Sequence, residues 1–155
     1  MLRLSPVRAV LYGGLTVATL DILDAFIFFG LRSGSTPQRI LQSIASGLIG
    51  RQAATQGGLE TAVLGAVLHY FIASMIVLVY YLASRRWRIL SAKPIVCGIF
   101  YGLVVYAVMN YVVVPLSAIG GGVRIAATPV LINGLLIHAF GVGLPSALFS
   151  RAAAR

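Results

Sequence analysis

The chain has 155 residues, of which 59% are hydrophobic and only 10% are charged, and its mean hydropathy is +0.97. Soluble domains carry about 25% charged residues, so this composition argues against a soluble fold and indicates that a lipid bilayer surrounds the protein. The net charge is +9, but the twelve Lys and Arg lie outside the apolar segments or at their ends. We therefore interpret the basic residues as topology signals and expect no nucleic-acid partner.

Four apolar segments are long enough to cross a bilayer core of about 30 Å, which needs about 20 helical residues. These segments are residues 9–31, 59–82, 95–116 and 126–149. Long continuous apolar runs do not fit the alternating strands of about ten residues that build a membrane β-barrel. The sequence therefore predicts an all-α integral membrane four-helix bundle that forms a single domain over residues 1–155.

The first predicted span contains two carboxylates, Asp21 and Asp24, which share a helix face because they are three residues apart. A carboxylate that faces lipid is costly, so we expect both to face the interior of the bundle. Gly14 lies on the same face and would allow another helix to pack closely. No small-residue cleavage site with polar sequence after it ends this span, and we expect it to be an uncleaved span.

The segment 36–56 is too polar to cross a bilayer and predicts an amphipathic helix on the outer membrane surface. Thr36 is the expected N-cap, Pro37 fits the first helical position, and Gly57 and Gly58 would end the helix. The apolar face would hold Ile40, Leu41, Ile44, Leu48 and Ile49, and the polar face Arg39, Gln42, Ser43, Ser46 and Gln52. The helix is either an ordinary connection packed on the bundle or a segment that binds a partner or acts as a plug.

The distribution of basic residues predicts that both termini lie in the cytoplasm, because basic residues are enriched in cytoplasmic loops. In this orientation eight basic residues are cytoplasmic and four are outside. The cytoplasmic set is Arg3, Arg8, Arg85, Arg86, Arg88, Lys93, Arg151 and Arg155, and the outer set is Arg32, Arg39, Arg51 and Arg124. Glu60 would start the second span, where the helix dipole favours a carboxylate.

The two histidines of the chain, His69 and His138, both stand in the pattern G-x-x-x-H-x-F, at residues 65–71 and 134–140. Upstream of each histidine, a ten-residue segment begins with Tyr-Gly and ends with a polar residue. These segments are residues 12–21 and 101–110, and their alignment pairs Asp21 with Asn110. Two motifs in the same order predict that the bundle is built from two duplicated helical hairpins, with segment 36–56 inserted in the first.

Because each copy would contain two spans, the copies would be related by a pseudo-two-fold axis along the membrane normal. His69 and His138 should then lie at similar depth. Gly65 and Gly134 each precede a histidine by about one helical turn, and we expect them to permit close helix packing.

We expect an intramembrane polar layer that consists of Asp21, Asp24, His69, Asn110 and His138. Asp21 and His69 each lie ten residues from the outer end of their predicted span, which predicts a hydrogen bond between them. The duplicate of this bond would join Asn110 to His138. Three roles remain open: polar contacts that hold helices together, a proton or solute path, and binding of haem by His69 and His138.

No catalytic pattern accompanies this layer. The sequence has no G-x-S-x-G elbow, no H-E-x-x-H motif and no phosphate-binding loop, and its single cysteine, Cys97, lies in an apolar run. We therefore expect no enzymatic activity and no metal site, and haem is the one cofactor that the histidines leave open.

Four short segments, residues 14–21, 41–50, 68–71 and 110–117, together resemble a group of small bacterial four-span inner-membrane proteins of uncharacterised function. More loosely, the chain is similar to YagU-like inner-membrane proteins. The resemblance implies a bacterial cytoplasmic membrane and transfers no catalytic residue. We expect a non-enzymatic membrane protein, either an accessory subunit beside other membrane subunits or a small homo-oligomer, and the alternative is a transporter or proton conduit that uses the polar layer.

Overall fold

The computed structural model describes residues 4–120, 122 and 126–153, and every regular element in this part of the chain is a helix. Two of the elements, η1 and η2, are π-helical turns. In chain order the elements are α1 (Pro6–Ser33), α2 (Pro37–Ile49), α3 (Arg51–Gln56), α4 (Gly58–Arg86), α5 (Arg88–Ala92), α6 (Pro94–Val108), η1 (Met109–Val113), α7 (Val114–Leu116), α8 (Thr128–Leu136), η2 (Ile137–Gly143) and α9 (Leu144–Ala153).

Four of the resulting helices are long and apolar enough to cross a membrane: α1, α4, the continuous run α6–η1–α7 and the continuous run α8–η2–α9. Their ends differ from the predicted spans by four residues or fewer. The prediction of four long apolar helices in an all-helical fold is therefore confirmed.

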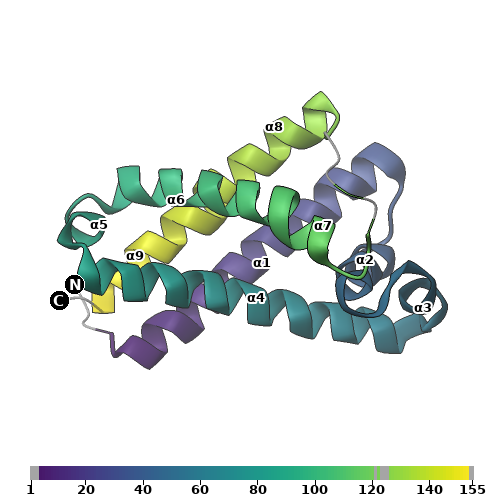
Figure 1. Ribbon diagram of the computed structural model, residues 1–155, viewed down its shortest axis with the longest axis horizontal. Helices are drawn as coiled ribbons and strands as arrows, with labels where there is room; N and C mark the ends of the chain where they lie inside the picture. Colours follow the sequence, from purple (N-terminus) through teal and green to yellow (C-terminus); the bar gives the residue numbers. More distant parts are fainter. Residues whose placement is uncertain (1–3, 121, 123–125, 154–155) are drawn as a thin grey trace.

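The four long helices lie alongside one another as a bundle (Figure 1). The described ends of the chain and α5 lie at one end of the bundle, and α2 and α3 lie at the other (Figure 1). Helix α1 packs against α4 and α9, whereas α6 packs against η2 and α9. Helix α2 packs mainly against α4 and so covers the bundle at the end remote from the termini.

Capping residues fix where α1 and α2 begin. The side chain of Ser5 accepts a hydrogen bond from the backbone N–H of Arg8, and that of Thr36 accepts one from Arg39, each at 3.3 Å. A proline follows each cap at the first helical position, where its missing N–H costs nothing. The predicted start of the second helix at Thr36 is therefore confirmed.

Large apolar side chains cover the outside of the bundle. Leu31 is 86% exposed, Leu59 72% and Phe100 66%. The interior instead packs small and branched residues, with Val17 and Val77 almost fully buried. An exterior this apolar would aggregate in water and is typical of a bundle with a lipid-facing surface.

The segment between α1 and α4 differs from the predicted continuous helix. It breaks at Gly50, whose φ of 81° lies in the region that favours glycine, and so forms two helices, α2 and α3. The break turns the chain and lets α3 reach the start of α4.

The predicted division of faces on α2 is also partly wrong. Gln42 and Ser46, expected on the outer polar face, are only 3% and 6% exposed, whereas Leu48 is 60% exposed. The Gln42 amide donates a hydrogen bond to the carbonyl of Gly58 at 2.8 Å. The buried Gln42 thus finds its partner on α4, whereas the Ser46 hydroxyl donates to the Ser43 carbonyl within α2.

Candidate functional site

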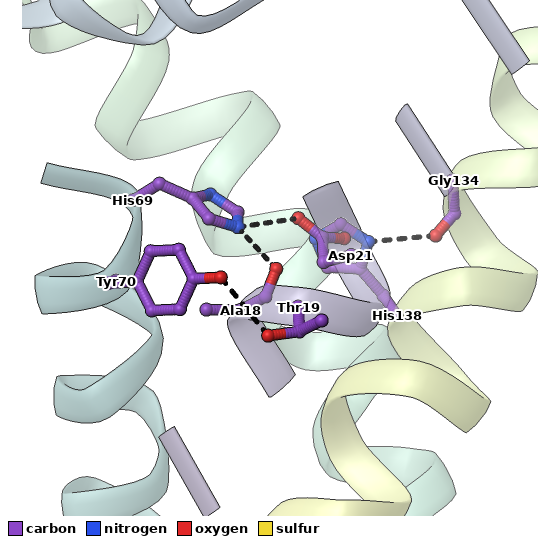
Figure 2. A network of polar contacts seen from close by, with 7 residues as sticks. All are labelled: Ala18, Thr19, Asp21, His69, Tyr70, Gly134 and His138. Atoms are coloured by element: carbon purple, nitrogen blue, oxygen red, sulfur yellow. Dashed lines mark hydrogen bonds and ion pairs between the residues drawn. The ribbon is translucent and has the colours of Figure 1, made fainter. Parts of the chain in front are cut away.

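Asp21 of α1 lies at the centre of the polar site, between a histidine from α4 and a histidine from η2 (Figure 2). Its carboxylate oxygen Oδ2 is 4.0 Å from Nε2 of His69, and Asp21 lines one cavity with both histidines. The side chain of Asp21 is 27% exposed and that of His69 is 12% exposed. The structure thus brings the two histidines of the repeat to one carboxylate.

His69 bonds to the backbone of α1 rather than to Asp21. Its Nε2 lies 2.9 Å from the carbonyl oxygen of Ala18, and because a carbonyl only accepts, Nε2 carries the hydrogen in this contact. The predicted hydrogen bond between Asp21 and His69 is not formed at 4.0 Å, although the two groups are neighbours. One residue further along each helix, the hydroxyls of Thr19 and Tyr70 are hydrogen-bonded at 3.1 Å (Figure 2).

His138 bonds within its own helix. Its Nδ1 donates to the carbonyl of Gly134 at 3.0 Å, and its ring packs edge-on against Tyr106 with centroids 5.3 Å apart. The Asn110 amide donates to the carbonyl of Tyr106 at 2.9 Å. The predicted bond between Asn110 and His138 is therefore wrong, because both side chains bond to the backbone one turn earlier in their own helices.

The two residues that do not bond to each other as predicted both lie in π-helical turns. Asn110 is in η1 and His138 is in η2. A π-turn inserts one extra residue into the helical repeat and rotates the side chains that follow it. Asp21 and His69 lie in uninterrupted α-helices. The local backbone therefore differs between Asp21 and Asn110, and between His69 and His138, although the sequence motifs align them. Turns of this π-helical kind are frequent at functional sites.

Asp24 faces a different helix from Asp21. Its Oδ2 accepts a hydrogen bond of 2.7 Å from the Asn133 amide, which joins α1 to α8. Asp24 and Asn133 line an open hollow together with Phe28 and Arg32. Of the five residues predicted as one polar layer, Asp21, His69, Asn110 and His138 line one cavity, and Asp24 belongs to a separate contact.

That cavity has a volume of about 290 Å³. Ile40, Ser43 and Ile44 of α2 line it together with the four polar residues, so α2 is part of the site. A water molecule occupies about 30 Å³ in the liquid, so the cavity has room for several.

The three glycines expected to permit close packing have different neighbours. A Cβ at Gly14 would overlap Ser74 of α4, and one at Gly65 would overlap the backbone carbonyl of Leu41 in α2. A Cβ at Gly134 would instead meet the ring of Tyr106.

The tightest backbone contact between α6 and the last long helix involves glycines that the sequence analysis missed. A Cβ at Gly102 would overlap the His138 carbonyl, and one at Gly143 would overlap the backbone of Gly98 and Gly102. The spacing Gly98-x-x-x-Gly102 is a known signal for close helix approach and indicates that another helix packs tightly on α6, although it does not identify that helix.

The two histidines do not fit a pair of axial haem ligands. A ligating histidine binds iron through one ring nitrogen and donates from the other. His138 has this arrangement with Nε2 left free, because Nδ1 donates to Gly134. In His69 the donating nitrogen is Nε2, so only Nδ1 is left for iron, and the neighbouring Cβ hinders the approach of that nitrogen to a haem. Among the described residues, no three His, Cys, Asp or Glu side chains are grouped to hold a metal ion.

No family model matches the sequence, and neither a curated protein nor a solved structure matches it. The role of the chain has to follow from its own residues and their geometry.

Proposed function

We propose that the chain is a non-enzymatic multi-pass integral protein of the bacterial cytoplasmic membrane. The observation that carries this proposal is the set of four long helices whose exteriors are covered by large apolar side chains. Burying such an exterior in lipid removes the cost of exposing it to water. The resemblance to small bacterial four-span inner-membrane proteins supports the bacterial cytoplasmic membrane as its location.

The charge distribution supports a topology with both termini in the cytoplasm. Six described basic residues, Arg8, Arg85, Arg86, Arg88, Lys93 and Arg151, belong to the ends of helices at the end of the bundle where the described chain begins and ends (Figure 1). Arg32, Arg39 and Arg51 lie toward the other end. Arg3, Arg124 and Arg155 were also counted in the prediction, and they lie outside the described residues.

Cysteine labelling in intact cells tests this topology. In a Cys97→Ser background, Arg39→Cys and Arg88→Cys each introduce one thiol at an exposed position, on α2 and α5 respectively. We expect a membrane-impermeant maleimide to label position 39 in intact cells and position 88 only after permeabilisation. The reverse pattern would exclude cytoplasmic termini.

The polar site is best explained as a joint between helices. Toward the termini, the core next to the Asp21 site is apolar, and Val17, Val77 and Val142 are at most 2% exposed. The contacts of His69 and Asn133 with α1 are of the kind that hold membrane helices together at about 0.6–2 kcal/mol each.

A proton conduit is the second candidate, and the position of Asp21 between two histidines beside a cavity favours it. Flux measured with a pH-sensitive dye in proteoliposomes separates the two proposals. A joint predicts no flux above that of empty liposomes, and a conduit predicts flux that Asp21→Asn abolishes. Asp24→Asn is the matched control, because Asp24 lies outside the cavity.

An accessory subunit or homo-oligomer is supported by the open hollow that Asp24 and Asn133 line between α1 and α8. A half-buried carboxylate at the outer surface of an apolar bundle is costly to leave against lipid. We infer that another membrane helix covers it. If that helix belongs to a second copy of the chain, oxidation of an Ile27→Cys variant in the Cys97→Ser background should cross-link two copies, because Ile27 lines the hollow. Val63→Cys on α4 is the control, because Val63 is similarly exposed but does not line the hollow, and it should give no cross-link. A monomer with neither cross-link would favour a different subunit.

We also propose that the two helix pairs descend from a duplicated hairpin. In support, α1 pairs with α4, α6 pairs with η2 and α9, and each pair carries its histidine on the later helix. In an experimental structure, residues 12–21 with 64–71 should superpose on 101–110 with 133–140 in helix order and direction. Opposite helix directions would reject the duplication.

A further inference from the structure

A hollow of about 560 Å³ opens at the end of the bundle where the described chain begins and ends. It lies between the last turns of α4, the short α5 and the last turns of α9. Arg85, Arg88 and Arg151 line it, together with the hydroxyl-bearing residues Tyr81, Ser84 and Ser91. This site is separate from the Asp21 cavity and shares no lining residue with it.

The hollow is strongly basic and has no acidic side chain to balance it. The whole sequence contains three carboxylate side chains, Asp21, Asp24 and Glu60. Glu60 starts α4 and Arg85 ends it, which separates them by 25 helical residues, about 37 Å. The one contact between an acidic and a basic side chain within 4.0 Å among the described residues is that of Asp21 with His69. Three guanidinium groups therefore share a hollow without a carboxylate side chain from the described chain.

Two features show that the hollow is suited to an anion. The Arg85 guanidinium is oriented, because Nη1 donates to the Tyr81 hydroxyl at 3.1 Å and its carbon lies 6.0 Å from the centre of that ring. The Ser91 hydroxyl is buried and has no hydrogen-bond partner in the described protein. A buried hydroxyl normally finds a partner, and rotation of the Ser91 side chain toward the hollow, which this residue lines, would let it donate to an anion there.

We propose that this hollow binds the phosphate group of an anionic membrane phospholipid. Guanidinium groups match phosphate oxygens in geometry and form charge-assisted hydrogen bonds with them. Basic pockets between helices on the cytoplasmic side are typical sites for such headgroups. Beside the hollow, Trp87 and Ile89 are 59% and 53% exposed and offer an apolar surface to an acyl chain, and tryptophan favours the headgroup level. The inference rests on the proposed membrane location.

The competing explanation is that these arginines act only as topology signals, which need charge but no pocket. Arg86 distinguishes the two explanations. It has the same charge and lies at the same end of α4, but it does not line the hollow. Its substitution removes one charge from this end of the molecule and leaves the hollow intact.

Trp87 is the only tryptophan of the chain, so its fluorescence reports on the lipids around the hollow. The full chain is reconstituted in vesicles of phosphatidylcholine and phosphatidylglycerol, and either lipid carries bromine on its acyl chains to quench tryptophan. We expect phosphatidylglycerol to quench more strongly than phosphatidylcholine at equal mole fraction. Arg88→Gln and Arg151→Gln should each lower this preference about fivefold, the equivalent of about 1 kcal/mol per basic residue at an anionic surface. Arg88→Lys should retain most of it, and Arg86→Gln should leave it unchanged.

Flotation with pure phosphatidylcholine vesicles is measured for every variant, and a chain that fails to float contradicts the membrane location rather than the lipid site. Equal quenching by both lipids in the floating wild-type protein would overturn the lipid site. Equal losses from Arg86→Gln and Arg88→Gln would also overturn it, because diffuse charge would then explain the preference. Release of the lipid by inorganic phosphate at constant ionic strength would reassign the hollow to soluble phosphate and overturn the lipid source.

Discussion

The pair α1–α4 and the pair formed by α6 with η2 and α9 both contain the motif G-x-x-x-H-x-F, and they use it differently. His69 bonds across the helix interface to Ala18, whereas His138 bonds to Gly134 in its own helix. The backbone at His69 is a regular α-helix and that at His138 is a π-turn. A short motif therefore fixes the residue types but not the partner, which depends on the local backbone and on the helix packed against it.

The glycines of the two motifs show where the difference arises. Gly65 faces the backbone of α2, an element that the second pair lacks, and Gly134 faces the side chain of Tyr106. The first glycine therefore contacts a helix backbone, and the second contacts an aromatic side chain. A backbone neighbour cannot move without moving its whole helix, whereas a ring can tilt.

The largest effect that we predict separates these two glycines. Gly65→Ala should lower the free energy of unfolding by about 3 kcal/mol, at the upper end of overpacking costs, because its Cβ would overlap the Leu41 carbonyl. Gly134→Ala should cost about 1–2 kcal/mol, because the Tyr106 ring can shift. Unfolding of the purified protein in mixed detergent micelles measures both.

Gly58→Ala does not serve as a control, because its φ of 58° is itself strained for alanine. Gly30 is the suitable control, since a Cβ there would meet its nearest neighbour at an ordinary 3.8 Å. An equal loss at Gly65 and Gly134 would mean that α2 yields as readily as a side chain.

The second prediction concerns the attachment of α2 itself. Gln42→Leu should lower the free energy of unfolding by about 1–2 kcal/mol, because it removes the hydrogen bond from a buried amide to the Gly58 carbonyl. Leu48→Ala is the control, and at 60% exposure it should change stability by less than about 0.5 kcal/mol in detergent. If Leu48→Ala proved the more damaging variant, Leu48 would pack against protein rather than against detergent.

The third prediction compares the histidines with the ring shape preserved. His69→Phe should cost about 1 kcal/mol, because it removes a hydrogen bond between helices. His138→Phe should cost about 0.3 kcal/mol, since the lost bond lies within one helix and the packing on Tyr106 is kept. Both are measured in the same unfolding assay. A larger loss for His138→Phe would show that its interaction with Asp21 outweighs the backbone bond of His69.

Much of this fold could be predicted from the sequence because the long helices follow from the hydrophobicity of whole segments rather than from single contacts. Four runs of about 20 apolar residues, and the cap and proline at Thr36 and Pro37, identify helices whatever their neighbours are. The faces of α2 could not be predicted in the same way, because Gln42, expected on the polar face, is buried against α4, where it finds a backbone carbonyl as its partner.

The residues that form the polar site could be predicted from the sequence, but their hydrogen-bond partners could not. The cost of burying charge identified Asp21 and the two histidines as residues that need partners. Which groups became partners depended on the π-turns η1 and η2, and periodicity does not reveal these. The contact between Asp24 and Asn133 joins residues 109 positions apart and required the packing of α1 against α8 and η2 to be known.

That contact gives the last prediction, an effect smaller than the losses expected at Gly65, Gln42 and His69, and it tests whether polar groups link the two pairs. The Oδ2 of Asp24 on α1 accepts from Asn133 on α8 at 2.7 Å, so a double-mutant cycle of Asp24→Ala and Asn133→Ala should give a coupling energy of about 0.6 kcal/mol, the average for such bonds in a membrane protein. The cycle of Asp21→Ala with Asn133→Ala is the matched control and should give no coupling, because Asp21 faces the cavity with the histidines. Equal coupling in both cycles would indicate a general effect of removing a carboxylate from α1. No coupling in either would mean that apolar packing alone joins the pairs, and that Asp24 is free to contact a partner in the hollow beside it.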